Sequence, residues 1–244
     1  MPKNSISLLK KFIKMQEIKE EKESKDRKKV FGIFLTNKLE TIDNILEDIP
    51  DNELIFEKKF LEPACGYGIF ILKIIEKAFR IKNDKNLISQ FIGNNLFFCD
   101  INKDMIIETE KNIKLFFRDL FETDYLGNFN SFNEDFTKIT FLKKKDNLGK
   151  YIGFFDFIIG NPPYVSLYGR RDKKINEKQR IYYLRNYNQF PKELKNGKIN
   201  LVMLFLEKGI QFLSDNSELS FIIDITFFET AYKYCREYLL KNFY

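Results

Sequence analysis

Residues 154–164 have the sequence Phe-Phe-Asp-Phe-Ile-Ile-Gly-Asn-Pro-Pro-Tyr, an apolar run that stops at a turn containing two prolines. The run predicts a buried strand, because short continuous apolar segments are typical of strands covered on both faces. Pro162 and Pro163 fix the backbone, so the Asn161 side chain and the Pro162 carbonyl are expected to be rigidly held acceptors. Such acceptors can grip an amino group, and Tyr164 offers an aromatic face to a planar base. The alternative is a rigid turn without a function.

Short apolar runs alternate with helical patterns on both sides of this stretch. The alternation predicts an α/β fold with a parallel sheet and right-handed crossovers. Ligands of such sheets bind at the carboxyl ends of the strands. We expect strands at 59–61, 96–99, 139–142, 154–159 and 219–225, and helices at 68–80, 103–117, 201–213 and 229–241.

The first expected strand leads into a loop with two glycines, Leu61–Gly68. Glycines allow a sharp turn and a close approach of the backbone to a ligand, although a plain strand-to-helix turn fits the pattern equally well. No Gly-Lys-Ser/Thr follows, which excludes a Walker phosphate loop. The acidic Glu62, without a basic neighbour, disfavours a phosphate and leaves room for a cationic ligand.

Acidic residues also accompany the second and third expected strands. Asp100 ends the second strand, where α/β folds often hold two ribose hydroxyls. Its alternative role is the N-cap of the following helix, which Asn102 can fill instead. Asp135 and Phe136 precede the third expected strand and suit an adenine, with the carboxylate accepting from the amino group and the ring packing on the purine. The alternative for this pair is a surface loop with one buried Phe.

The composition excludes several kinds of site. The 244 residues contain no histidine and no tryptophan, so a Ser-His-Asp triad, a histidine general base and the usual histidine-type zinc site are ruled out. Three cysteines without Cys-x-x-Cys spacing indicate reduced thiols in a cytoplasmic protein. No apolar run approaches the ~20 residues of a membrane span. We therefore expect neither a metal nor a membrane association.

In combination and in order, these motifs resemble the S-adenosylmethionine-dependent DNA adenine-N6 methyltransferases of restriction-modification systems, from Gly32 to Phe243. The resemblance implies a Rossmann-like methyltransferase sheet. Gly32–Thr36 is similar to the motif over the cofactor's methionine part, with Asn37 where the family has Pro. Residues 200–209 and 219–228 resemble two supporting motifs, and Asp224 stands where the second normally has Pro. The implied cofactor-binding residues are Thr36, Glu62, Pro63, Ala64, Gly66, Gly68, Asp100, Ile101, Asp135 and Phe136.

The same resemblance implies that Asn161, Pro162, Pro163 and Tyr164 are catalytic. Adenine N6 is a poor nucleophile because its lone pair is delocalised into the ring. Acceptors at Asn161 and Pro162 would hold both amino hydrogens and direct the lone pair at the sulfonium methyl. Tyr164 would stack on the flipped base and favour its transient positive charge.

The positive charge is concentrated in one segment, residues 165–198. This segment has ten basic and three acidic residues, a net charge of +7, whereas the whole chain has +6. Its tyrosines, Tyr168, Tyr182, Tyr183 and Tyr187, are interleaved with the basic residues. Basic and aromatic side chains next to a base-binding motif predict contacts with the backbone of double-stranded DNA. The alternative is a solvated flexible loop.

Residues 1–30 are expected to form a charged, solvated N-terminal helix or arm, and residues 31–244 the catalytic domain with its basic insertion. The family fold continues past its fifth strand and adds a target-recognition domain. We therefore expect a sheet truncated after the fifth strand, as in a gene fragment or one half of a split enzyme. A separate C-terminal chain that carries target recognition is the candidate partner, and the apolar edge of the fifth strand would need a cover.

Two other classes of function remain open at this point. A methyltransferase acting on protein glutamine or on RNA can share the Asn-Pro-Pro-Tyr motif, because a glutamine amide and an exocyclic base amine pose similar problems. A non-catalytic fragment that binds only the cofactor or DNA would keep the same motifs. The Gly32–Thr36 motif and the basic insertion favour DNA over the first alternative.

Overall fold

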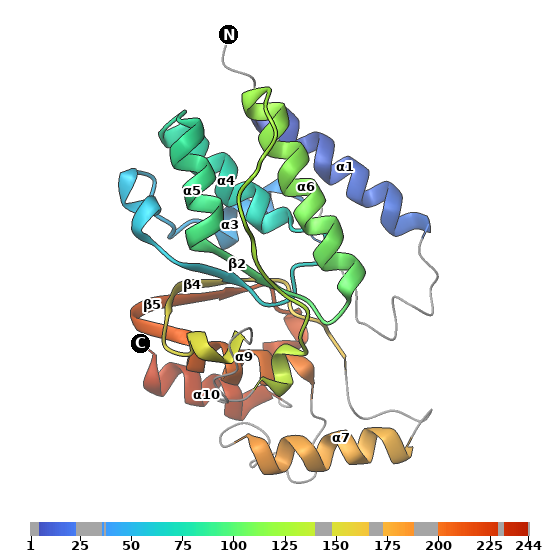
Figure 1. Ribbon diagram of the computed structural model, residues 1–244. Coiled ribbons are helices and arrows are strands. Elements are labelled where there is room, and N and C mark those ends of the chain that lie inside the picture. The colour runs from blue at the N-terminus through green and yellow to red at the C-terminus, as the bar shows by residue number, and fades with distance from the viewer. Residues whose placement is uncertain are drawn as a thin grey trace.

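The protein is described by a computed structural model, which covers residues 5–22, 36, 38–139, 148–165, 173–187, 200–228 and 232–243. Within these residues the chain forms a five-stranded sheet in the order β3-β2-β1-β4-β5, and all paired strands are parallel. The expected α/β fold is thus confirmed (Figure 1). The strands are β1 (Phe60–Glu62), β2 (Leu96–Cys99), β3 (Asn130–Phe132), β4 (Phe155–Gly160) and β5 (Leu213–Phe221).

Helices cover both faces of the sheet. Helices α1, α4, α5 and α6 lie together on one side in Figure 1, and α9 and α10 lie on the other, with α7 furthest from the sheet on that side. The α-helices are α1 (Ser5–Lys22), α3 (Leu39–Ile45), α4 (Ile69–Ile81), α5 (Lys85–Asn95), α6 (Lys103–Phe121), α7 (Lys173–Asn186), α9 (Leu201–Phe212) and α10 (Lys233–Asn242). Short 3₁₀ turns occur at η1 (Glu53–Glu57), η2 (Phe136–Lys138), η3 (Leu148–Tyr151) and η4 (Ile225–Phe228).

The alternation of side chains along each strand explains why the strands are continuous apolar runs in the sequence. Phe60 of β1 and Phe98 of β2 belong to the core beneath α1, α4, α5 and α6. Their neighbours Leu61 and Phe97 point the other way, into a second core that contains Phe205 of α9. Because both faces are buried, the strands need apolar residues at nearly every position.

Helix α1 differs from the expected solvated arm. Leu9 and Phe12 are buried in the core that contains α4 and α6. The Ser5 hydroxyl donates to Glu76 of α4, and Lys19 forms an ion pair with Glu108 of α6. Residues 5–22 are therefore an integral layer of the fold, because the helix buries an apolar stripe despite its many charges. Residues 23–30 lie outside the described part of the chain.

The third strand lies elsewhere than expected. Strand β3, at 130–132, pairs with β2, and its three-residue sequence is too short and polar to predict a strand. Its register is supported by Asn130, whose amide donates to the carbonyls of Gly93 and Leu96. Of the segment expected at 139–142, Ile139 follows η2 and the rest lies outside the described residues. Asp135 and Phe136 consequently follow the third strand instead of preceding it. Strand β5 also starts and ends earlier than expected, at 213–221.

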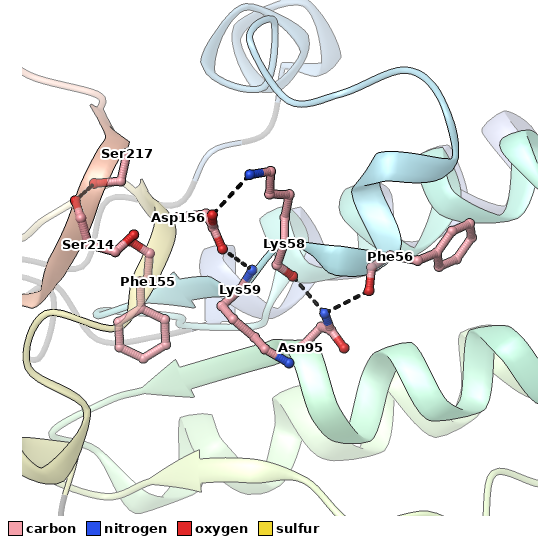
Figure 2. A network of polar contacts seen from close by, with 8 residues as sticks. All are labelled: Phe56, Lys58, Lys59, Asn95, Phe155, Asp156, Ser214 and Ser217. Carbon is pink, nitrogen blue, oxygen red and sulfur yellow. Dashed lines mark hydrogen bonds and ion pairs between the residues drawn. The ribbon is translucent and has the colours of Figure 1, made fainter.

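A polar network closes the amino-terminal edge of the sheet between β1 and β4 (Figure 2). Asp156 accepts from the Lys58 ammonium at 3.1 Å and from the Lys59 backbone N–H at 2.8 Å. The Asn95 amide donates to the carbonyls of Phe56 and Lys58, at 3.0 and 2.7 Å. These bonds satisfy backbone groups that lie just before β1, where no neighbouring strand pairs with them.

Candidate functional site

The loop after β1 is hydrogen-bonded to α6 and to the end of β2. Thr109 of α6 donates its hydroxyl to the Gly66 carbonyl at 2.9 Å, and the Asn112 amide donates to the Tyr67 carbonyl at 3.0 Å. Gly68 has a left-handed φ of 78°, and a Cβ there would lie 2.6 Å from Thr109 Cγ2. Only glycine therefore fits position 68. Thr109 and Asn112 were not singled out from the sequence, although polar residues three apart on the buried face of a helix are a usable signal.

Glu62 is the most unusual group of this loop. Its side chain is 1% exposed, and its Oε2 accepts no hydrogen bond within the described residues. Burial raises the pKa of the Glu62 carboxyl well above its ordinary value; a hydrogen bond from the Ile71 backbone N–H opposes this shift, and the nearby Asp100 adds to it. Pro63 is also buried and Ala64 partly so. A buried acid with an unused oxygen is costly, and a cationic or donor-rich ligand would offset that cost.

Asp100 lies at the end of β2, beside the same loop. Its two oxygens accept from the backbone N–H groups of Gly66 at 3.0 Å and Asn102 at 2.8 Å. Asn102 caps α6 by accepting from the Asp104 N–H, so Asp100 is not needed for that role. Burial raises the pKa of Asp100. The next residue, Ile101, is 55% exposed, an apolar surface at the carboxyl edge of the sheet.

Asp135 and Phe136 follow β3, and their side chains have different surroundings. The Asp135 carboxylate accepts from the backbone and hydroxyl of Thr137, at 3.1 and 2.6 Å, and pairs with Lys138 at 2.6 Å. The Phe136 ring is 2% exposed and packs between Phe205 and Phe212 of α9. The expected contact of this ring with a purine is therefore corrected to a core contact, because α9 covers the ring.

The motif after β4 is tied to both neighbouring segments. Asn161 donates from its amide nitrogen to the Thr36 hydroxyl at 3.2 Å, which makes Oδ1 the acceptor end of the side chain. Thr36 is itself buried, and its carbonyl accepts from Gln16 of α1. Pro162 is buried and Pro163 half-buried. A contact between 36 and 161 brings together two motifs that are 125 residues apart in the chain.

Tyr164 lines a cavity next to this motif. Its hydroxyl donates to the Ile222 carbonyl at 2.6 Å, and burial and Asp224 raise its pKa to about 12. Asp224 follows β5 and is exposed. The cavity has a volume of about 200 Å³ and is lined by Tyr164, Asn200, Val202, Ile223, Asp224, Phe227 and Tyr232.

The strand order brings the predicted residues to one edge. Glu62 is the last residue of β1, and Asp100, Asp135 and Asn161 follow β2, β3 and β4. Parallel strands end at the same side of a sheet. The ends of β1 and β4 are in direct contact, since a Cβ at Gly160 would lie 3.7 Å from Glu62 Cγ. Gly66, Gly68 and Ile101 lie in the same loops.

The basic segment is only partly brought to this edge. Residues 166–172 and 188–199, including Tyr168, lie outside the described residues. Within α7, Lys178 and Arg185 are exposed, as a DNA-binding role requires. Tyr183 and Tyr187, in contrast, are 2% and 1% exposed, so their rings serve packing and not the expected contacts with DNA.

In the part of the chain that the structure describes, no group of three or more His, Cys, Asp or Glu side chains is placed to hold a metal ion. None of its helices has the length and apolar character needed to cross a membrane.

Comparisons with known proteins agree with this fold. The Type II methyltransferase M.AccI of Acinetobacter calcoaceticus is 28% identical over 186 residues, 76% of this chain and 27% of M.AccI. This chain thus spans about a quarter of that relative's length. A DrdV–DNA complex has the same fold with a TM-score of 0.59 and 19% identity, over 88% of this chain and 23% of that one. A nuclease-deletion mutant of the Type ISP restriction-modification enzyme LlaGI, in complex with a DNA substrate mimic, has a TM-score of 0.63 and 17% identity. The match covers 86% of this chain and 20% of that one.

The strongest comparison is at the level of a whole family. The model of the family described as Eco57I restriction-modification methylase matches residues 5–244, including α1 and the motifs that follow all five strands. The chain therefore belongs to the Eco57I restriction-modification methylase family.

Proposed function

We propose that this chain is the cofactor-binding and catalytic part of a DNA adenine-N6 methyltransferase that uses S-adenosylmethionine. The observation that carries the proposal is the meeting of Glu62, Asp100, Asp135 and Asn161 at one edge of the sheet, in a chain of a restriction-modification methylase family. An amino-acid cofactor with a ribose and a purine offers a partner to each of these groups.

The residues present fit this cofactor. The unused oxygen of Glu62 suits the ammonium group of the cofactor's methionine part. A carboxylate has about four acceptor positions, so Asp100 can accept from ribose hydroxyls while it keeps its two backbone donors. The exposed Ile101 offers an apolar surface to the purine, and Asp135 an acceptor for its amino group.

The chemistry would depend on acceptors and a fixed geometry: as N6 bonds to the methyl group, the methyl–sulfur bond would break, and one amino hydrogen would leave as a proton to solvent. The bound cofactor supplies an electrophilic methyl group on a sulfonium. Asn161 Oδ1 and the Pro162 carbonyl accept the two amino hydrogens of adenine, which directs the N6 lone pair away from the ring plane. Thr36 holds the Asn161 amide in this orientation, so the hydrogen-bonding site is formed before the substrate arrives. The Tyr164 hydroxyl, bound to the Ile222 carbonyl, fixes the ring for stacking on the extruded base.

Double-stranded DNA is the proposed substrate. Exposed Lys178 and Arg185 on α7 belong to the segment that holds the chain's positive excess. Two of the similar structures, DrdV and LlaGI, contain bound DNA or a DNA substrate mimic, and those proteins have the same fold.

The test is adenine methylation in a host that lacks it, with this chain expressed together with its downstream open reading frame. We expect N6-methyladenine in the host DNA, and a loss of at least ~100-fold in methyl transfer for Asn161→Ala, with cofactor affinity changed by less than about threefold. Asn242→Ala is the matched control, because Asn242 is exposed and its amide donates to the Tyr238 carbonyl of the same helix. Methylation of protein or RNA in place of DNA, or N4-methylcytosine in the DNA, would contradict the proposal.

A further inference from the structure

A single threonine connects the proposed adenine-binding acid with the basic helix. Thr137 donates its hydroxyl to Asp135 Oδ1 at 2.6 Å, and the same hydroxyl oxygen lies 3.0 Å from the Tyr183 hydroxyl of α7. A hydroxyl has one hydrogen to donate, so Tyr183 is the donor in the second bond. The Thr137 carbonyl accepts from the Tyr187 hydroxyl at 2.5 Å. Thr137 thus receives one bond from α7 and one from Tyr187, the residue that follows α7, and gives two bonds to Asp135.

Tyr183 of α7 and Tyr187, which directly follows the helix, are both buried. The Tyr187 N–H donates to the Tyr183 carbonyl at 3.0 Å, and the two rings pack edge to face with centroids 5.6 Å apart. Leu204 of α9 completes their cluster. Burial raises the pKa of both hydroxyls, so they are donors at neutral pH. The exposed Lys178 and Arg185 belong to α7, so this cluster anchors the helix that carries them.

The other end of η2 is closed by a buried lysine. Lys208 of α9 donates to the Ile139 carbonyl at 2.9 Å, and its ammonium lies 5.2 Å from the centre of the Tyr187 ring. Burial lowers its pKa. Asp135, η2 and the tyrosines therefore form one connected polar network within a buried cluster, in which removal of one bond weakens its neighbours.

We propose that Thr137 is a positioning residue that couples cofactor binding to the docking of α7 and thereby to DNA binding. The inference rests on the proposed function, in which Asp135 receives the cofactor's adenine and α7 faces DNA. When Asp135 takes up the adenine amino group, its partner Thr137 is held more firmly and fixes Tyr183 of α7 and the adjacent Tyr187. Coupling of this kind is reciprocal, so DNA must tighten cofactor binding by the factor by which the cofactor tightens DNA binding.

The experiment measures the dissociation constant for S-adenosylmethionine by titration calorimetry, without and with a saturating short duplex at low salt. For the wild type we expect the duplex to tighten cofactor binding at least about fivefold. Thr137→Val keeps the shape but lacks the hydroxyl, and we expect it to weaken cofactor binding about tenfold and to abolish the effect of DNA. Thr137→Ser should restore both.

Two further variants separate coupling from folding. Tyr183→Phe removes the bond between the Thr137 hydroxyl and α7 and leaves the bond from Tyr187 to the Thr137 carbonyl, so it should keep the cofactor affinity without DNA within about threefold and lose the effect of DNA. Ser131→Ala removes a hydroxyl of β3 that bonds Glu110, away from the network, and should behave like the wild type. Wild-type coupling in Tyr183→Phe would overturn the inference even if Thr137→Val does not fold. A wild-type chain that binds no cofactor would overturn the proposed function itself.

Discussion

Two carboxylates on neighbouring strands, Glu62 at the end of β1 and Asp156 near the start of β4, have opposite surroundings. Asp156 is one-quarter exposed and uses both oxygens, one with the Lys58 ammonium and one with the Lys59 N–H (Figure 2). Glu62 is almost fully buried, and its Oε2 accepts no hydrogen bond from the described residues. The two acids stand at opposite edges of the same sheet.

The difference separates an acid that completes the fold from an acid that suits the proposed cofactor. Most buried polar groups in a folded protein are hydrogen-bonded, and both oxygens of Asp156 follow this rule. A buried acid with an unused oxygen lowers stability, and in the proposed function the cofactor's ammonium group is the partner that offsets this cost. The edge that contains Glu62 also contains Asp100, whose pKa is likewise raised by burial.

The largest expected effect is on cofactor affinity. Glu62→Gln keeps the shape but removes the charge that would pair with the cofactor's ammonium group. Loss of one partner of a buried charge pair costs about 2–4 kcal/mol, so S-adenosylmethionine should bind roughly 30-fold to 1000-fold more weakly. Asp156→Asn, the same change at the other edge, should leave the affinity within threefold. Equal affinities of both variants, measured by calorimetry, would show that the two edges do not differ in function.

The next effect concerns the rigidity of each edge. At Gly68 a methyl group would combine left-handed strain with a 2.6 Å clash against Thr109, so Gly68→Ala should lower the free energy of unfolding by about 3 kcal/mol. Gly153, just before β4, has a φ of 73°, and a Cβ added there would meet no atom within 4 Å. Gly153→Ala should therefore cost only the strain, about 1–2 kcal/mol.

Urea unfolding of both glycine variants gives the comparison directly. A loss in Gly68→Ala no larger than that in Gly153→Ala would mean that α6 yields to the added methyl group. In that case the loop after β1 is softer than its contacts with Thr109 and Asn112 indicate.

The sequence predicts the apolar strands and the residues at their ends better than it predicts side-chain surroundings. Strand β2 has the expected limits, and Asn102 caps α6, the role that was the alternative for Asp100. The motifs that contain Glu62 and Asn161 follow β1 and β4, because a buried parallel strand leaves a clear apolar run before its functional end.

Features that depend on tertiary contacts escape sequence reasoning. Strand β3 has the sequence Asn-Ser-Phe and forms because β2 offers it an edge, not because of its own pattern. Tyr183 and Tyr187 stand among basic residues and suggest contacts with nucleic acid, yet η2 and α9 bury them. Phe136 likewise belongs to the core, since α9, more than 60 residues later in the chain, covers its ring.

A further test uses the pH dependence of stability. The pKa of Glu62 is raised in the folded protein above its ordinary value of 4.5. Such a group binds its proton more tightly when folded, so its contribution to stability is present at low pH and is lost as the pH rises from 4.5 through the folded-state pKa. Glu62→Gln removes this loss, and without cofactor it should be more stable than the wild type at neutral pH by at least about 1 kcal/mol. Asp100 has the same sign and is common to both proteins. Parallel stability curves of the two proteins between pH 4 and 8 would contradict a buried Glu62 whose Oε2 accepts no hydrogen bond.

The smallest effects belong to the network at the amino-terminal edge. Lys58→Ala removes one partly exposed ion pair and should lower the free energy of unfolding by less than about 1 kcal/mol, and less still in high salt. Asp156→Ala also leaves the Lys59 N–H without its acceptor, and should cost about 1–3 kcal/mol. Asp156→Asn should lie between them, because the amide oxygen still accepts from Lys59. A different order would mean that the ion pair, and not the backbone bond, closes this edge. Since none of these residues faces the proposed cofactor, all three variants should bind it like the wild type, which is the property that distinguishes this edge from the one that contains Glu62.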